Sequence, residues 1–205
     1  MNRKDHWQEI YRRKPASSVS WFCEHDQASW EWIDAWSLRP TDPIIDVGGG
    51  ASTFVDDLLL RGFSDVTVLD VSEASLAAAQ DRLGGKSTQV RWVVVDVLES
   101  ALPDKRYRLW RDRAVFHFLT DTQDRRAYVE QLRRSLAADG HVLLATFALD
   151  GPEQCSHLPV VRYDEGGLQA ELGRDFVLIR SQKVMHETPA GKRQAFLYCH
   201  FTRAA

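Results

Sequence analysis

Three consecutive glycines stand between an apolar segment and a helical pattern. They form the centre of Asp46-Val-Gly-Gly-Gly-Ala-Ser52, directly after the β-rich segment 43–47. Glycine lets the backbone approach a ligand closely, and a strand-to-helix turn points free N–H groups at it. We therefore expect Gly48, Gly49 and Gly50 to lie against a bound ligand, although a glycine triplet alone is also typical of a plain turn.

Two carboxylates stand where the next two β-rich segments end. Asp70 lies 20 residues after Gly50 (70 − 50 = 20), and Asp96 ends the segment 90–96. An acid at the first position accepts hydrogen bonds from both hydroxyls of a ribose. A carboxylate at the second reaches an adenine amino group. Val71 and Val97, which follow these acids, are expected contacts of the same ligand, so the pattern predicts an adenosine-containing ligand at the carboxyl edge of a sheet.

The turn also narrows the type of adenosine ligand. Nicotinamide and flavin dinucleotides favour G-x-G-x-x-G, but Gly50 is followed by Ala-Ser-Thr at 51–53, so the third glycine is missing. Asp46 would repel a diphosphate, whereas it suits a ligand that carries a cationic amine or sulfonium. A nicotinamide oxidoreductase is therefore the weaker alternative.

The elements that position these residues alternate along the chain. The sequence predicts strands at 43–47, 66–70, 90–96, 107–112 and 141–147, and helices at 54–61, 73–83 and 121–138. This alternation predicts a mostly parallel sheet covered on both faces. A short helix is expected at 168–172, then extended runs at 176–187 and 194–202, joined by a Pro-x-Gly hairpin. Two short helices are expected before the sheet, at 4–14 and 25–36.

Composition limits the class of protein. The chain has 205 residues, 44% hydrophobic and 27% charged, with a net charge of −3, so we expect one globular domain that binds no nucleic acid by bulk charge. No apolar run approaches the ~20 residues that span a bilayer, and the first residues do not form a secretory signal. Three cysteines without a C-x-x-C pair indicate neither a disulfide framework nor a metal site. We expect a cytoplasmic monomer or homodimer.

The chain resembles the class I S-adenosylmethionine-dependent methyltransferases. The resemblance rests on the glycine-rich turn, segments 68–72, 93–97 and 107–118, and the closing hairpin, and it covers residues 40–203. It implies a Rossmann-like doubly wound, seven-stranded α/β sheet, parallel except for the last strand, and S-adenosylmethionine as cofactor. By this resemblance the glycines pass beneath the methionine part, Asp70 holds the ribose, and Asp96 meets the adenine. Asp46 and Asp112 complete the expected cofactor contacts.

The N-terminal segment is similar to the opening of the eukaryotic elongation-factor lysine methyltransferases, in His6-Trp7-x3-Tyr11 and Ser20-Trp-Phe22. Segment 111–117 resembles their fourth-strand motif, but Arg113 replaces its lysine and His117 its later acid. We therefore expect a small-molecule acceptor. A protein lysine methyltransferase and a non-catalytic cofactor-binding protein are the alternatives. The expected organisation is a single domain, 1–205, with a helical cap at 1–39 and a core at 40–205.

The acceptor side is predicted from position. His117 is the candidate general base because imidazole titrates near neutrality, although methyl transfer depends largely on alignment and desolvation. The loop 151–163 follows the fifth strand at the same edge, and we expect it to cover the acceptor. The expected acceptor contacts are Trp21, Cys155, His157, Arg162 and Tyr163.

Overall fold

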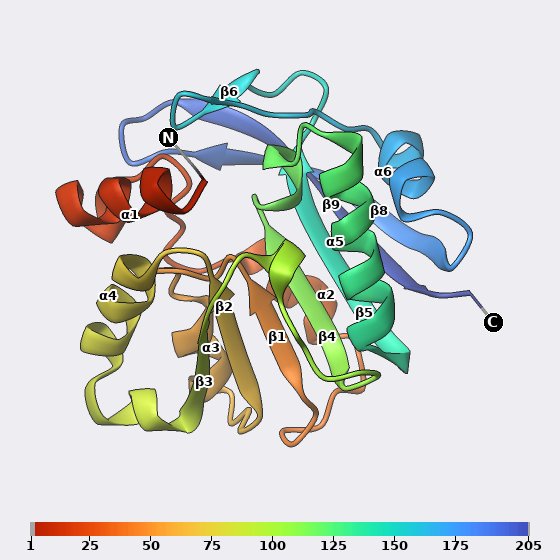
Figure 1. The fold of residues 1–205 in the computed structure, drawn as a ribbon, viewed down its shortest axis with the longest axis horizontal. Helices are drawn as coiled ribbons and strands as arrows, with labels where there is room; N and C mark the ends of the chain where they lie inside the picture. The colour runs from red at the N-terminus through yellow and green to blue at the C-terminus, as the bar shows by residue number, and fades with distance from the viewer. Residues whose placement is uncertain (1–2, 205) are drawn as a thin grey trace.

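The computed structural model describes residues 3–204, so the ends of the predicted domain, residues 1, 2 and 205, lie outside it. Seven strands form one sheet in the order β3-β2-β1-β4-β5-β9-β8 (Figure 1). Their bounds are β1 (Ile44–Val47), β2 (Val66–Asp70), β3 (Val90–Val94), β4 (Tyr107–Arg113), β5 (Leu136–Phe147), β8 (Phe176–Glu187) and β9 (Arg193–Arg203). Strands β1 to β5 pair in parallel, and β9 runs antiparallel to both β5 and β8. The predicted seven-stranded sheet with its antiparallel last strand is confirmed.

The strand order reverses beside β1. The chain proceeds from β1 to β2 and β3 on one side and then crosses to β4 on the other side. In open α/β sheets, ligands bind outside the carboxyl ends of the strands at such a reversal. The glycine-rich turn, which follows β1, therefore lies where the topology favours a ligand.

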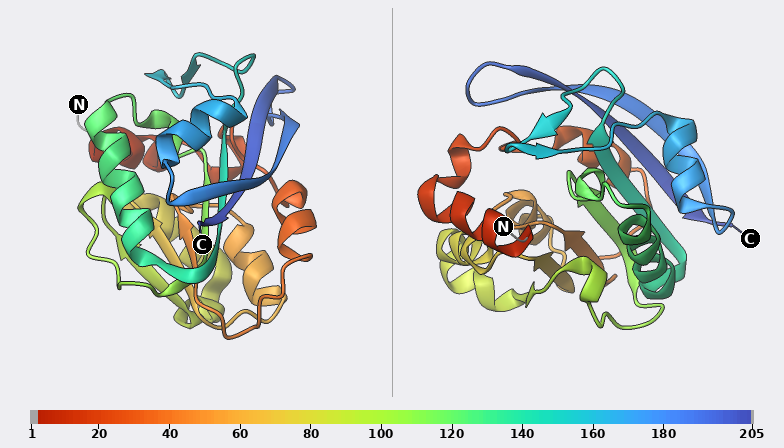
Figure 2. Two further views of the ribbon diagram at one scale, coloured as in Figure 1. Left: turned by 90° about the vertical axis from the view of Figure 1, so that its right-hand side faces the viewer. Right: turned by 45° about the horizontal axis from the view of Figure 1, so that its top comes forward.

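Helices cover both faces of the sheet, as the views in Figure 2 show. Ile44 and Ile45 are both fully buried, and they belong to the cores on opposite faces, which is the alternation expected of a strand covered on both sides. One core includes side chains of α2 (Gln27–Ile33), α3 (Phe54–Leu60) and α4 (Glu73–Leu83), and the other includes those of α5 (Thr122–Ser135) and α6 (Glu165–Leu172).

Two further pieces lie at the same end of the sheet (Figures 1 and 2). Helix α1 (Arg3–Arg13) has no buried residue and contacts α4. The hairpin of β6 (Gln154–Cys155) and β7 (Leu158–Pro159) forms a separate two-stranded ribbon. Short 3₁₀ turns complete the fold, at η1 (Ala16–Ser18), η2 (Gly84–Gln89), η3 (Val97–Glu99) and η4 (Phe116–Phe118).

The largest boundary difference from the sequence prediction is at the junction of α5 and β5. The helix begins as predicted, with Asp121 as its N-cap, but it ends at Ser135 instead of continuing to 138. Leu136 is fully buried and pairs with Tyr107, so β5 starts there. Gly140, two residues beyond the predicted end of the helix, lies inside the strand, where an added Cβ would be 2.9 Å from the Tyr107 carbonyl oxygen. Burial of Leu136 thus decides the boundary.

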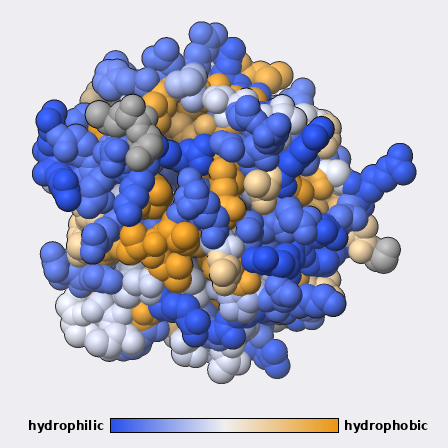
Figure 3. All heavy atoms as spheres, viewed as in Figure 1, coloured by the Kyte–Doolittle hydropathy of each residue, from blue (hydrophilic) through white to orange (hydrophobic). Residues whose placement is uncertain are grey.

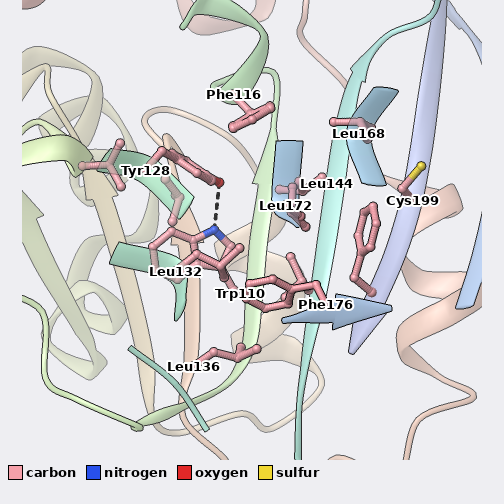
Figure 4. Packing of buried hydrophobic residues seen from close by; sticks show 14 of the residues in the cluster. Trp110, Phe116, Tyr128, Leu132, Leu136, Leu144, Leu168, Leu172, Phe176 and Cys199 are labelled. Carbon is pink, nitrogen blue, oxygen red and sulfur yellow. Dashed lines mark hydrogen bonds between the residues drawn. The ribbon is translucent and has the colours of Figure 1, made fainter. Parts of the chain in front are cut away.

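The core under α5 and α6 contains a buried polar network. The Trp110 indole nitrogen donates to the Tyr128 hydroxyl at 2.8 Å (Figure 4). That hydroxyl donates in turn to Asp112 at 2.6 Å. The network joins α5 to the carboxyl end of β4, and it fixes the chain that leaves β4 toward the site.

Candidate cofactor and acceptor site

The glycine-rich turn brings three chain segments into close contact. Gly48 and Gly50 have φ values of +67° and +44°, which disfavour other residues. A Cβ on Gly48 would overlap the Val115 side chain, and one on Gly50 would lie 2.8 Å from Asp70 Oδ2. Glycine at these positions therefore lets the ends of β1, β2 and β4 meet at a distance that no larger residue permits.

The main cavity lies at the carboxyl ends of β1 to β4. Its walls come from α1, the segment before α2, the strand ends and the β6–β7 hairpin: Arg3, Trp7, Tyr11, Trp21, Val47, Gly48, Leu69, Asp70, Val71, Val95, Asp96, Val97, Arg113, Ala114, Val115, Phe118, Leu119 and Cys155. On this face of the molecule, apolar atoms gather between α4 and α5 inside a polar surround (Figure 3). The structure thus brings together seven residues predicted from the sequence, which are Trp21, Gly48, Asp70, Val71, Asp96, Val97 and Cys155.

Asp70 ends β2 and faces this cavity. Its Oδ1 accepts a hydrogen bond from the Ser72 backbone at 2.8 Å, which orients the carboxylate. Burial raises the pKa of Asp70 to about 6, against the lowering effect of hydrogen bonds from Ser72, Ser75 and the Val71 backbone. A carboxylate held in this way stands ready to accept further hydrogen bonds, such as those of two vicinal hydroxyls.

Asp96, which follows β3, connects the cavity wall to α1. Its Oδ1 caps η3 through the Leu98 backbone at 3.0 Å, and its Oδ2 pairs with Arg3 at 2.9 Å. Arg3 also pairs with Asp124, at 2.6 Å. Further along α1, the Gln8 side chain accepts hydrogen bonds at the start of α4. Polar contacts near both sides of the cavity therefore hold α1 across it.

Part of the cavity wall is aromatic. The rings of Trp7 and Trp21 lie 5.4 Å apart, and those of Trp7 and Phe118 lie 5.0 Å apart, both edge to face. Trp21 Nε1 donates to the Tyr11 hydroxyl at 3.1 Å. Burial, with a smaller effect of Asp70, raises the pKa of Tyr11 well above its usual value, so its hydroxyl stays protonated. Such rings suit an apolar or planar group, or a sulfonium.

Asp46 corrects one sequence expectation, because it does not reach the cavity. It is 1% exposed, and its Oδ1 pairs with Arg111 at 2.6 Å. Its Oδ2 lies under the turn, 2.5 Å from where a Cβ of Gly49 would stand. Arg111 also pairs with Asp26, at 2.6 Å. Asp46 therefore supports the glycine-rich turn from behind instead of facing a ligand. Gly49 and Gly50 do not line the main cavity either, and Gly49 lines a side cavity next to it.

Asp112 is the second correction. Its Oδ1 accepts from the Val115 backbone at 2.8 Å, and its Oδ2 accepts from the Tyr128 hydroxyl at 2.6 Å. Burial raises the pKa of Asp112 to about 7, against the effect of these hydrogen bonds. The side chain lies in the core, so its role is to shape the turn after β4, which carries the cavity residues Arg113 to Val115.

His117 is the third correction. It is fully buried, and its Nδ1 accepts a hydrogen bond from the Phe147 backbone at 3.2 Å. Burial, aided by the nearby Arg113, lowers the pKa of His117 to about 3, so the ring is neutral and a poor base. The η4 turn directs Phe118 toward the cavity and His117 into the core. The geometry therefore argues against His117 as the general base.

The loop 151–163 contributes less than expected. Its β6–β7 hairpin turns at Ser156 and His157, both at positive φ, as a two-residue turn requires. Cys155 lines the cavity, and burial raises its thiol pKa to about 11, which keeps it neutral. His157 is exposed at the turn, and Arg162 pairs with Glu153 at 3.1 Å.

Tyr163, the last expected acceptor contact, is buried beside Phe116, with ring centroids 5.6 Å apart. Of the four expected contacts in this loop, Cys155 alone lines the main cavity. The other three residues, His157, Arg162 and Tyr163, stay outside it because of the pairing of the hairpin and the burial of Tyr163.

Eleven residues of the main cavity were absent from the predicted site, and two of them, Arg113 and Arg3, are charged. Arg113 stood in the sequence only as the replacement for the motif lysine, and that correspondence was the available signal. For Arg3 the sequence offered no such signal, because its partners, Asp96 and Asp124, are 93 and 121 residues away in the chain. Within residues 3–204, no group of three or more His, Cys, Asp or Glu residues is placed to hold a metal ion. Among the same residues, no helix has the length and hydrophobicity needed to cross a membrane.

Known proteins resemble this chain in sequence and in fold. Residues 44–140 match the model of a family described as a methyltransferase domain. A SAM-dependent methyltransferase from Anabaena variabilis has a similar structure, with a TM-score of 0.76 at 16% identity, over 100% of this chain and 96% of that one. A second solved structure is described as the conversion of a disulfide bond into a thioacetal group during echinomycin biosynthesis. It has a TM-score of 0.78 at 14% identity, over 98% of this chain and 93% of that one.

Curated relatives point to the same class. EEF1A lysine methyltransferase 2 of Danio rerio is 25% identical over 162 residues, which is 71% of this chain and 69% of the relative. The eEF1A lysine and N-terminal methyltransferase of Mus musculus is 21% identical over 140 residues, 68% of this chain but 20% of the relative. This chain thus spans about a fifth of the length of that relative. These comparisons agree with the resemblance to class I S-adenosylmethionine-dependent methyltransferases, and the solved structures confirm the predicted fold.

Proposed function

We propose that this chain transfers the methyl group of S-adenosylmethionine to a small-molecule acceptor. One observation carries the proposal: Trp7, Tyr11 and Trp21 line the main cavity, and the carboxylates that line it among residues 3–204 are Asp70 and Asp96, which the proposal assigns to the ribose and the adenine. With both carboxylates engaged by the cofactor, the lining leaves none for a cationic side chain, which favours a small-molecule acceptor over a protein lysine.

The cavity fits the cofactor. The space over Gly48 lies beside the end of β2, where Asp70 can accept from a ribose. The apolar residues Val71, Val95 and Val97 can flank an adenine, and Asp96 can meet its amino group. In this proposal the adenine amino group either replaces Arg3 as the partner of Asp96 or binds the same carboxylate together with Arg3.

When bound, S-adenosylmethionine supplies an electrophilic methyl group on a positively charged sulfur. The chain contributes orientation through Asp70, and its aromatic rings stabilise positive charge next to the sulfur. Helix α1 and the β6–β7 hairpin exclude water from the transfer path. Because His117 lies in the core, the proposal assigns rate enhancement to alignment and desolvation.

We also propose that residues 3–39 form a cap of the same single domain and do not fold independently. Three contacts support this: Arg3 pairs with Asp96, Gln8 bonds to Ser72 at 3.0 Å, and Trp30 is buried against Phe54 with ring centroids 4.9 Å apart. Cytoplasmic location, a monomeric or homodimeric state, and the absence of nucleic-acid or membrane partners stay predictions.

A protein lysine acceptor is the second candidate. The names of the curated relatives favour it, and so does a side cavity between the segment before α2 and the tip of the β8–β9 hairpin. That cavity includes Glu24 and Glu187, which suit a cationic peptide, but it also includes Arg113.

The test is methyl transfer from labelled S-adenosylmethionine to two panels. The first contains small thiols, amines, phenols and carboxylic acids, and the second contains elongation-factor protein and lysine peptides. We expect label in the first panel and none with Asp70→Ala. Label in protein lysine alone would favour the second candidate, and no transfer by a chain that binds the cofactor would favour a non-catalytic binding protein.

A further inference from the structure

Arg113 occupies the junction of three cavities. It lines the main cavity, the side cavity beside the glycine-rich turn, and the side cavity at the β8–β9 hairpin. Its Nη1 donates to the Trp21 carbonyl at 2.7 Å, and its Nε donates to the Tyr198 hydroxyl at 2.9 Å. The guanidinium lies 4.8 Å from the centroid of the Phe196 ring. The side chain is therefore held in place by neutral groups, in a position that faces ligand space.

The charge of Arg113 is not matched by a direct carboxylate partner, in contrast to its neighbour. Arg111 pairs with both Asp46 and Asp26, each at 2.6 Å. Arg113 reaches Asp26 only through the Tyr198 hydroxyl, which donates to that carboxylate at 3.0 Å. Within residues 3–204 its Nη2 makes no hydrogen bond. Arg113 is half-buried, and a guanidinium with free N–H groups in such a position is a natural partner for a carboxylate.

The surroundings of Arg113 indicate what carries that carboxylate. Trp7, Trp21 and Phe118 provide apolar and aromatic surface in the same cavity, and Cys155 adds a neutral thiol. A cationic acceptor would be repelled by the positive charge of Arg113. A neutral acceptor would leave the free N–H groups without a partner, which is costly in a desolvated site.

We propose that Arg113 binds the carboxylate of the methyl acceptor, and that this acceptor is a small organic acid with a planar apolar body. The proposal rests on the proposed function, since it concerns the acceptor of that same reaction. Arg113 then selects anionic over neutral and cationic compounds, and the aromatic wall orients the body of the acceptor. The same carboxylate chemistry could come from the methionine part of the cofactor, so the experiment separates these two sources.

The experiment measures binding of matched probes to the protein saturated with S-adenosylhomocysteine. Benzoate, benzamide and benzylamine share one ring and differ in charge, and calorimetry or ligand-observed NMR gives their affinities. We expect benzoate to bind at least about tenfold more tightly than benzamide, as is typical for a charge-assisted pair. Arg113→Met keeps an apolar stem against Phe196 and should reduce benzoate to the level of benzamide. Arg174→Met, at an exposed arginine outside the three cavities, is the control.

Each outcome has one meaning. Equal affinity for benzoate and benzamide in the native chain overturns the proposal without any variant, so a poorly folded Arg113→Met cannot leave the question open. Tighter binding of benzylamine overturns it in favour of a cationic acceptor. Weaker S-adenosylhomocysteine binding in Arg113→Met, with unchanged binding of 5′-methylthioadenosine, overturns it by assigning Arg113 to the cofactor carboxylate. No S-adenosylhomocysteine binding by the native chain refutes the proposed function itself.

Discussion

Replacing Asp70 by alanine tests the ribose site that we propose at the end of β2. The change removes a carboxylate that the Ser72 backbone orients at 2.8 Å and that the proposal makes the acceptor for two ribose hydroxyls. Hydrogen bonds to a charged group contribute roughly 1.5–3 kcal/mol, so affinity for S-adenosylhomocysteine should fall about 10- to 100-fold. Calorimetric titration measures the change. Asp81→Ala, on the exposed face of α4, is the matched control and should not alter affinity.

The raised pKa of Asp70 adds a second, independent signature. Hydrogen bonds from a ribose favour the ionised carboxylate, so ligand affinity should decrease as pH falls below about 6, and Asp70→Asn should lose this dependence. The free energy of unfolding depends on pH in the opposite direction to ligand affinity. Because the folded pKa lies above the unfolded value of 3.8, the folded chain binds more protons, and this carboxyl lowers the unfolding free energy as pH rises from about 4 to 6. Asp70→Asn should therefore bind worse at pH 7 yet be no less stable.

The reasoning fails if a folded Asp70→Ala variant binds S-adenosylhomocysteine with native affinity. In that case the ribose lies elsewhere, and the raised pKa of Asp70 reflects a buried structural carboxyl.

Three further predictions concern α1, the core and η4. Arg3→Ala should increase the dissociation rate of S-adenosylhomocysteine about 2- to 10-fold in stopped-flow fluorescence, because exposed ion pairs contribute up to about 1 kcal/mol each; an unchanged rate would show that α1 does not retain the ligand. Tyr128→Phe should lower the unfolding free energy by about 2–4 kcal/mol in urea, since the Trp110 donor at 2.8 Å then lacks its acceptor and Asp112 lacks a donor at 2.6 Å; a loss below 0.5 kcal/mol would contradict this assignment. His117→Asn should keep the turnover rate within about threefold of the native value. A loss of ~10²-fold or more at native cofactor affinity would instead support His117 as the general base. Because the folded pKa of His117 is about 3, below the ordinary 6.5, this residue makes the unfolding free energy fall as pH drops from 6.5 to 3, and the variant should lose that slope.

The sheet and the cofactor half of the cavity could be predicted from the sequence because their signals are local. The alternation of β-rich and helical segments gives the strand number, and the residues after each parallel strand must meet at one edge. Gly48, Asp70 and Asp96 each stand at such a strand end, and the structure places all three in the main cavity.

The errors concern side-chain direction and long-range pairing, which residue spacing does not encode. Asp46 and Asp112 also stand at strand ends. However, Asp46 pairs with Arg111 and Asp112 accepts a hydrogen bond from Tyr128, so both carboxylates are buried behind the cavity wall. His117 and Phe118 are adjacent, and the η4 turn decides which one faces the cavity. Arg3 meets Asp96 across 93 residues, a contact that only the folded chain defines.

The most direct test of the account is a titration of the native chain with S-adenosylhomocysteine and, separately, with NAD. The turn at Gly48 lacks the third dinucleotide glycine, and we propose that the cavity beside it binds an adenosine with a cationic or thioether tail. The account predicts saturable binding of S-adenosylhomocysteine with one site per chain and no binding of NAD. Tight binding of NAD, or no binding of S-adenosylhomocysteine by folded protein, would contradict it.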